Sequence, residues 1–308
     1  MHEYPRTVLQ LRDWFADDGA CQDYLARLRW PDGFYCPACR GTDHWVTARG
    51  LRHCRGCGRQ TSVTAGTLFA DSHLPLRLWF EAIWHVTSQK SGVSALGMQR
   101  VLGLGSYRTA WNLLHKLRRA MVRPGRERLN GIVEVDETFI GGPRPGKRGR
   151  GARGKMLVVV AAQQAGEAIG RIRLTRVADA SAVSLEPAIV AAVEVGSQIR
   201  TDDWKGGLDR LGYRRQIVRS GAQVGENLLP LANRVASLLK RWLLGTHQGA
   251  VSAAHLDYYL DEITFRFNRR TSGSRGLLFL RLMQQAVDLS PVPAKEIVGG
   301  ITLGTSTN

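Results

Sequence analysis

Four cysteines in two close pairs constrain the fold of this chain more than any other feature of its sequence. Cys36 and Cys39 form one CxxC pair, and Cys54 and Cys57 form a second pair after fourteen intervening residues. Each pair makes a tight turn that directs two thiolates at one point, and two such turns complete a tetrahedral zinc site. A redox motif needs only one pair, and Cys21 is left over, so we favour a structural zinc ion over disulfides or redox chemistry.

The charge of the chain indicates a polyanionic partner. Among its 308 residues, 43 Lys and Arg oppose 26 Asp and Glu, which gives a net charge of +17. Such a surplus favours contacts with phosphate groups, although a generally basic protein is the alternative. No run approaches the roughly 18 apolar residues of a membrane helix, and the charged N-terminal residues do not resemble a signal peptide. We therefore expect a cytoplasmic protein without membrane association.

The N-terminal part is expected to contain two regions. Residues 1–72 would form an N-terminal helix over 8–29 and the zinc ribbon, and residues 73–130 a helix-turn-helix region. Ser94 and Ser106 are candidate N-caps for its second and third helices. Ten Lys or Arg face two acids between residues 74 and 130, which favours DNA binding over a plain bundle with a solvated basic face. The expected DNA contacts are Arg108, Asn112, Lys116, Arg118 and Arg119.

From residue 131 the pattern changes to that of strands. In IVEVDETFI, Glu134 and Asp136 alternate with valines, so the two acids share one face of a strand. Two more strands, a helix, a short strand that ends at Asp202, a further strand and a final helix follow. This order predicts a ribonuclease-H-like α/β fold. We expect a catalytic domain over 131–290 and a C-terminal tail over 291–308.

A basic loop follows the first of these strands. Residues 144–155 contain six Lys or Arg and no acid, together with several glycines. Such a loop is too charged to pack, so it is either disordered or lies along DNA phosphates. Its candidate DNA contacts are Lys147, Arg148 and Arg150.

The final helix, in residues 228–246, adds two polar side chains to the expected site. An apolar stripe that includes Val235 and Leu239 would face the core, whereas Asn233 and Lys240 lie seven residues apart on another face. Polar residues on an outer helix face are usually just solvated, so this pair gains weight only from the rest of the chain.

The expected topology brings three oxygen ligands together. In a ribonuclease-H-like fold, the middle of the first strand, the end of the fourth and the helix after the fifth converge at one edge. Asp136, Asp202 and Asn233 occupy these positions. Their oxygens suit Mg²⁺ or Mn²⁺, and two such ions about 4 Å apart can support phosphoryl transfer.

Several motifs resemble a known family. VDETFIGG, TDDWKGG, NRVASLLKRWLLGTHQGA and YLDEITFRFNRR resemble the catalytic domain of bacterial insertion-sequence transposases of the DDE superfamily. RWPDGFYCPAC and the stretch through LRRAM are similar to the ISXO-two-like branch, in which a zinc ribbon precedes the catalytic domain. The resemblance implies that Asp136 and Asp202 bind metal, that Asn233 takes the third ligand position, and that Lys240 binds terminal DNA phosphate.

Asparagine at position 233 departs from the commonest triad, which has glutamate there. An amide oxygen can coordinate Mg²⁺ but brings no charge, so DNA phosphate would have to balance the metal charge. We interpret the site as an active variant. We expect Glu137 and Asp203 to be structural, and Glu262 to form an ion pair with Arg266 at i+4.

The sequence therefore predicts a DNA transposase of the bacterial nucleoid. It would bind the terminal inverted repeats of its insertion sequence, cut the double-stranded DNA and join the freed 3′-hydroxyl to target DNA. Because two ends must be held together, we expect a homodimer or a larger assembly on DNA. The alternatives are a zinc-ribbon regulator with an inactive second domain, and a nuclease that differs only in its products.

Overall fold

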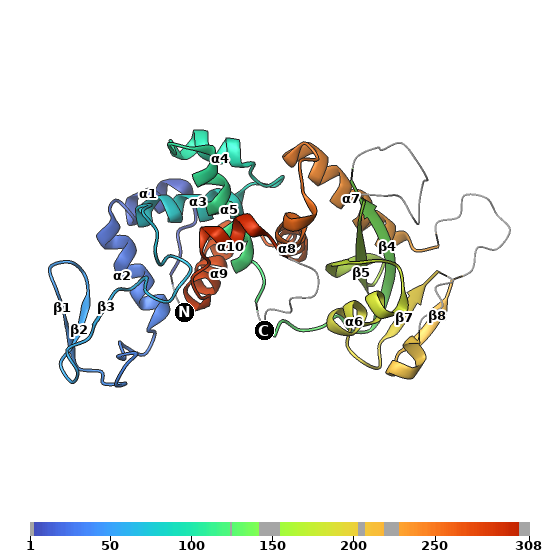
Figure 1. The fold of residues 1–308 in the computed structure, drawn as a ribbon, viewed down its shortest axis with the longest axis horizontal. Coiled ribbons are helices and arrows are strands. Elements are labelled where there is room, and N and C mark those ends of the chain that lie inside the picture. Colours follow the sequence, from blue (N-terminus) through green and yellow to red (C-terminus); the bar gives the residue numbers. More distant parts are fainter. Residues whose placement is uncertain (1–2, 124, 142–154, 203–206, 219–227, 302–308) are drawn as a thin grey trace. The chain divides into compact units, whose positions relative to one another are not determined.

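The chain forms two compact units in the computed structural model, which describes residues 3–123, 125–141, 155–202, 207–218 and 228–301 (Figure 1). The first unit contains residues 1–123 and 272–298, and the second contains residues 124–271 and 299–308. Among the described residues, no helix is both long and apolar enough to cross a membrane.

The first unit begins with two helices and a zinc ribbon. We expected one helix over residues 8–29, but this helix is interrupted between Trp14 and Asp18, and two helices form instead. Asp17 accepts a hydrogen bond from the N–H of Ala20 at 2.9 Å and so caps a new helix, because the first N–H groups of a helix lack partners within it. The elements are α1 (Val8–Trp14), α2 (Asp18–Arg29) and the antiparallel strands β1 (His44–Val46), β2 (Arg52–Cys54) and β3 (Gln60–Thr61).

The three helices expected after the ribbon are confirmed. They are α3 (Leu76–Ser88), α4 (Ala95–Leu102) and α5 (Tyr107–Ala120). Both expected caps are present, because Ser94 accepts from the N–H of Gly97 and Ser106 from that of Thr109, each at 3.0 Å. Gly103 ends α4 at φ 62°, a left-handed conformation that glycine adopts without strain.

Two C-terminal helices, α9 (Arg275–Asp288) and α10 (Ala294–Gly299), pack in the first unit (Figure 1). Phe279 of α9 is 0% exposed, and its ring centroid lies 6.2 Å from that of Phe15 and 5.9 Å from that of Phe80. We expected residues 131–290 to form one catalytic domain and 291–308 a tail. The structure instead groups α9 with the N-terminal helices, because its apolar face completes their aromatic core.

The second unit is built on a five-stranded sheet in the order β6-β5-β4-β7-β8. Strands β4, β5 and β6 pair antiparallel, whereas β7 lies parallel to β4 and β8 parallel to β7. This is the order expected from the sequence, and the ribonuclease-H-like α/β fold class is confirmed. The strands are β4 (Ile132–Ile140), β5 (Met156–Ala165), β6 (Ala168–Val177), β7 (Gln198–Thr201) and β8 (Arg214–Ile217).

Helices cover both faces of this sheet, and α6 and α7 lie on opposite sides of it (Figure 1). Val133 and Val135 of β4 pack in the core on the α6 side, and Val158 and Val160 of β5 in the core on the α7 side. Ile140 of β4 also lies in the core on the α7 side, so this central strand is buried on both faces, which makes an acid on it unusual. The helices are α6 (Ala182–Ala192), α7 (Pro230–His247) and α8 (Leu256–Asn268), with short 3₁₀ turns at Leu208–Leu211 and Ala253–His255.

Candidate functional site

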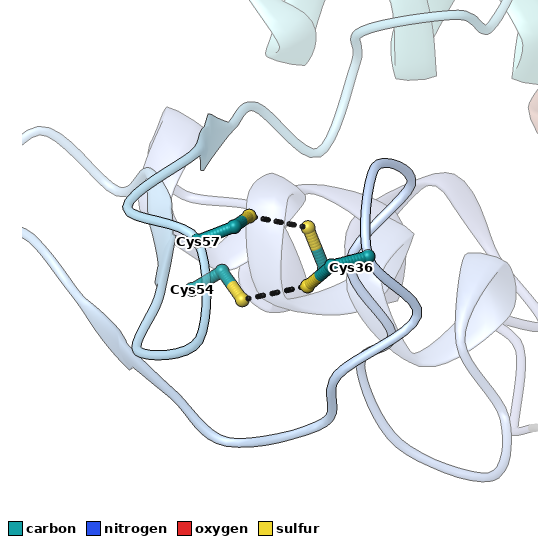
Figure 2. A group of neighbouring side chains, drawn as sticks. Cys36, Cys54 and Cys57 are labelled. Carbon is teal, nitrogen blue, oxygen red and sulfur yellow. Dashed lines mark hydrogen bonds between the residues drawn. The ribbon is translucent and has the colours of Figure 1, made fainter.

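The four paired cysteines meet at one point in the ribbon. Cys36 Sγ lies 3.5 Å from Cys57 Sγ, Cys39 Sγ lies 3.5 Å from Cys54 Sγ, and all four sulfurs are within 4.8 Å of one another. Figure 2 shows Cys54 and Cys57 on one loop, facing the loop that carries Cys36. Tetrahedral zinc with Zn–S bonds of about 2.3 Å places its sulfurs about 3.8 Å apart, so the cluster fits a structural zinc ion.

The two cysteine turns share one backbone design. The N–H of Arg40 donates to Cys36 O and that of Gly58 donates to Cys54 O, both at 2.9 Å. Both donor residues have positive φ, 63° at Arg40 and 71° at Gly58. In the first turn, the N–H groups of Cys39 and Ala38 lower the pKa of the Cys36 thiol to about 6. The turn therefore favours the thiolate, which is the form that binds metal.

Two aspartates come together from the neighbouring parallel strands β4 and β7. Asp136 is on β4, and Asp202 directly follows the last residue of β7. The last register pair between these strands is Glu134 with Arg200, and each aspartate follows its member of that pair by two residues. Neighbouring strands lie about 4.8 Å apart, and level residues of parallel strands project to the same face. The fold therefore brings these two sequence-predicted residues together.

A small hollow lies between the middle of β4, the end of β7 and α6. Asp136 and Asp202, both half-buried, contribute to its wall, and so do Glu137 and Thr201. Asp136 Oδ1 also accepts the N–H of Glu137 at 2.8 Å. The remaining lining is apolar and comes from Val135, Val159, Leu185 and Ile189. Because Asp136 alternates with Val135 and pairs with Val160, its side chain lies with Glu134 on the α7 face of the sheet, opposite the α6 face that supplies the apolar lining.

The first turn of α7 is held by an acid from the sheet. Its N-cap, Leu229, offers no side-chain acceptor, and a proline without an N–H occupies the first helical position. Leu231 and Ala232 donate their N–H groups to Glu134 Oε2 at 2.7 and 3.0 Å. The N–H of Asn233 makes the first helical bond, to Leu229 O at 3.0 Å. Every N–H group of this turn therefore has a partner.

Glu134 links the helix to the carboxylate pair. It is 2% exposed and lies two residues before Asp136, on the same face of β4. The strand that carries Asp136 is therefore tied to the helical turn that contains Asn233. Our sequence analysis did not identify this role. Two signals were available: an acid between two valines on the strand, and a helix start without a capping side chain.

The remaining expectations for α7 and α8 can be placed directly. Asn233 and Lys240 are exposed on α7, whereas Val235 and Leu239 of the predicted apolar stripe are buried. The expected ion pair of Glu262 with Arg266 is confirmed at 2.8 Å. Asp203 lies outside the described residues, as do the loop residues Lys147, Arg148 and Arg150.

The expected DNA contacts of α5 differ in their exposure. Arg108 is exposed near the start of the helix, whereas Asn112, Lys116 and Arg119 are half-buried. The Lys116 ammonium lies 5.9 Å from the centroid of the Trp79 ring, and burial lowers the pKa of this lysine. The surface of α5 that can reach a ligand is therefore centred on Arg108.

Arg118 requires a correction. We expected it to contact DNA, but its residue is 2% exposed and its guanidinium lies 3.3 Å from His115 Nδ1 inside the first unit. A side chain buried in this way cannot reach a phosphate, so Arg118 leaves the set of candidate DNA contacts. Its position in the helix faces the core, which charge alone does not reveal.

Two segments of the chain match families of known proteins. Residues 128–268 match the ISXO2-like transposase domain, and residues 16–60 match the transposase zinc-ribbon domain. A protein of Halobacterium salinarum, described as an uncharacterized protein in transposable element ISH50, is 30% identical over 142 residues. That match spans 44% of this chain and 45% of that protein, less than half of its length. The resemblance to transposases inferred from the motifs is therefore confirmed for both the ribbon and the sheet domain.

Proposed function

We propose that the protein is a DNA transposase that binds the terminal inverted repeats of its insertion sequence and catalyses metal-dependent cleavage and strand transfer. The observation that carries this proposal is that Asp136 on β4 and Asp202, directly after the parallel neighbour β7, line one hollow, and that Glu134 ties β4 to the turn that contains Asn233. The match of residues 128–268 to a transposase domain supports it.

In this proposal the carboxylates of Asp136 and Asp202 and the amide oxygen of Asn233 hold Mg²⁺ or Mn²⁺. These donors fit, because both ions prefer oxygen ligands. Two bound ions would activate the attacking oxygen and stabilise the leaving oxygen. In the first step a water oxygen replaces the 3′ oxygen on a phosphorus at the element end. In the second step the freed 3′-hydroxyl replaces the 3′ oxygen of a target nucleotide, so each step forms one P–O bond and breaks one.

DNA would contact both units. Lys240, two helical turns or about 10 Å along α7 from Asn233, would bind a terminal phosphate. Arg108, with Asn112, Lys116 and Arg119, would contribute to recognition of the element end, and the zinc ribbon would hold the N-terminal fold in shape. Lys147, Arg148 and Arg150 would add phosphate contacts. Two ends must be joined, so we propose a homodimer or larger assembly on DNA in the bacterial cytoplasm.

Substitution of either aspartate tests this function. The full chain is incubated with a labelled duplex from the DNA that flanks its gene, a target plasmid and Mn²⁺. Asp136→Ala and Asp202→Ala should bind the duplex as tightly as the wild type and give no cleaved or joined product. Asp209→Ala, an exposed acid of the same unit outside the hollow, is the matched control and should react normally. Loss of binding with retained cleavage would contradict the proposal.

One observation favours a second candidate. Asn233 leaves only two carboxylates among the proposed metal ligands, which also fits a DNA-binding regulator with an inactive second unit. A Mn²⁺ titration separates the two: binding that is lost in Asp136→Ala supports the enzyme, whereas duplex binding without any Mn²⁺ binding supports the regulator. Cleavage without joined products would instead indicate a nuclease.

A further inference from the structure

We propose that Glu134 is a positioning residue, which clamps the first turn of α7 and thereby holds Asn233 beside Asp136 and Asp202. The clamp is a pair of hydrogen bonds, from the N–H groups of Leu231 and Ala232 to one Glu134 oxygen at 2.7 and 3.0 Å. The inference rests on the proposed function, since it gives Asn233 a place in the metal site.

The start of α7 has no other means of closing its first turn among the described residues. Most helices are capped by a side chain of the preceding residue, but the N-cap here is Leu229, which makes no side-chain capping bond. The acceptor instead comes from a residue almost one hundred positions earlier in the chain. A local cap would fix only the helix, whereas an acceptor on β4 fixes the helix relative to the sheet.

The Glu134 acceptor lies close in sequence to one proposed metal ligand, and the N–H groups that it binds lie close to another. Glu134 is 2% exposed and shares a face of β4 with Asp136, and Ala232 directly precedes Asn233. The proposed ligands Asp136 and Asn233 are therefore connected through strand β4, the two Glu134 hydrogen bonds and Ala232. A carboxylate at a helix N-terminus also interacts favourably with the helix dipole. Metal ligands are commonly oriented by such supporting contacts, and loss of one typically costs 10- to 100-fold in metal affinity or activity.

Two substitutions of Glu134 distinguish its hydrogen bonds to α7 from an effect of its negative charge. Glu134→Gln keeps the side-chain length and an oxygen acceptor but removes the charge. Glu134→Asp keeps the charge but withdraws the oxygens by about 1.5 Å. We expect Glu134→Gln to retain Mn²⁺ binding and cleavage within roughly tenfold of the wild type, and Glu134→Asp to lose about 100-fold in kcat. The reverse order would show that Glu134 acts through its charge, for example as a metal ligand, and would overturn the proposal.

A double substitution tests whether Glu134 acts through Asn233. If it does, Glu134→Asp adds little to the loss already caused by Asn233→Ala, because the residue that it positions is gone. Multiplied losses in the double variant would show that the two residues act separately, and the positioning role would be rejected.

A matched control exists in the first unit. Asp18 accepts the N–H groups of Leu76 and Arg77 at 3.1 and 3.0 Å and so clamps α3 in the same manner, away from the proposed metal site. Asp18→Ala should weaken its helix start and leave kcat at saturating DNA and the affinity for Mn²⁺ unchanged. An equal loss in Asp18→Ala would mean that Glu134 contributes only to general stability.

Amide hydrogen exchange measures how firmly the first turn of α7 is held, and it does not require catalytic activity. Exchange in residues 230–236 should accelerate in Glu134→Asp and remain near the wild-type rate in Glu134→Gln, with the Mn²⁺ affinity falling in parallel. Unchanged exchange in Glu134→Asp would overturn the proposal. If the wild type binds Mn²⁺ but cleaves no DNA, the proposed function fails, while these two measurements still decide the role of Glu134.

Discussion

Single residues in the zinc ribbon show how a backbone requirement can be met by different side chains. The left-handed position of each cysteine turn is the fourth residue after the first cysteine, Arg40 in one turn and Gly58 in the other. The glycines in and beside these turns are Gly41, Gly56 and Gly58, and of these only Gly58 has a positive φ. Gly58 supplies the left-handed residue of the second turn, whereas in the first turn the strained position falls on an arginine, because hydrogen bonds on both sides fix the backbone there.

Gly58→Ala should therefore weaken zinc binding. An L-residue in the left-handed conformation costs about 1 kcal/mol, which corresponds to roughly a fivefold loss of zinc affinity in chelator competition. Gly56→Ala is the control, since its φ is not positive and its Cβ would lie 3.7 Å from the sulfurs of Cys39 and Cys54, an ordinary contact. Equal losses in both variants would argue against this account of the turn.

Elements in this protein are fixed partly by local and partly by distant partners. The caps of α4 and α5 could be predicted, since Ser94 and Ser106 bond residues three positions ahead. The free edge of strand β6 is hydrogen-bonded at one residue by a side chain far along the sequence. Asn268 accepts the N–H of Ile172 at 2.7 Å and donates to Ile172 O at 3.1 Å. Its side-chain amide thus pairs with the free edge as a neighbouring strand would, which protects that edge.

Removal of this amide should destabilise the second unit. Asn268→Ala leaves the N–H and C=O of Ile172 without these partners, so the free energy of unfolding in urea should fall by about 1–3 kcal/mol. Asn268→Asp should lose as much, because a carboxylate cannot donate to Ile172 O. Asn130→Ala is a suitable comparison: its exposed side chain accepts from Gln163 at 2.8 Å, and water can replace it. A neutral Asn268→Ala would rule out the edge-closing role.

In the whole molecule, the N-terminal residues and the distant segment 272–298 share one core. Phe279 packs with Phe15, Phe80 and Tyr24, and its ring centroid lies 6.0 Å from that of Trp84. A Cβ on Gly276 would fall 1.9 Å from Pro5 O, so glycine is what allows the N-terminal segment to approach α9. The folded first unit therefore needs a segment that follows the second unit in the chain.

Phe279→Ala should lower the stability of the first unit selectively. The loss of a fully buried aromatic side chain costs about 3–5 kcal/mol. Hydrogen exchange should accelerate in α2, α3 and α9 and change little in the sheet of the second unit. DNA-end binding should weaken at temperatures where the wild type still binds, while Mn²⁺ affinity is retained. Destabilisation of the sheet instead would show that α9 belongs with the second unit, as the sequence suggested.

Features that depend on spacing and alternation could be predicted from the sequence. These include the four-cysteine cluster, the strand order of the sheet, the apolar stripe of α7 and the adjacency of Asp136 and Asp202. Each follows from a short-range pattern or from a topology with few solutions. The polar residues whose partners lie far away in the chain could be identified only from the packing of the folded protein. Glu134 meets α7, Arg118 turns inward to His115 and α9 returns to the first unit, because a buried group is satisfied by whatever packing brings near it.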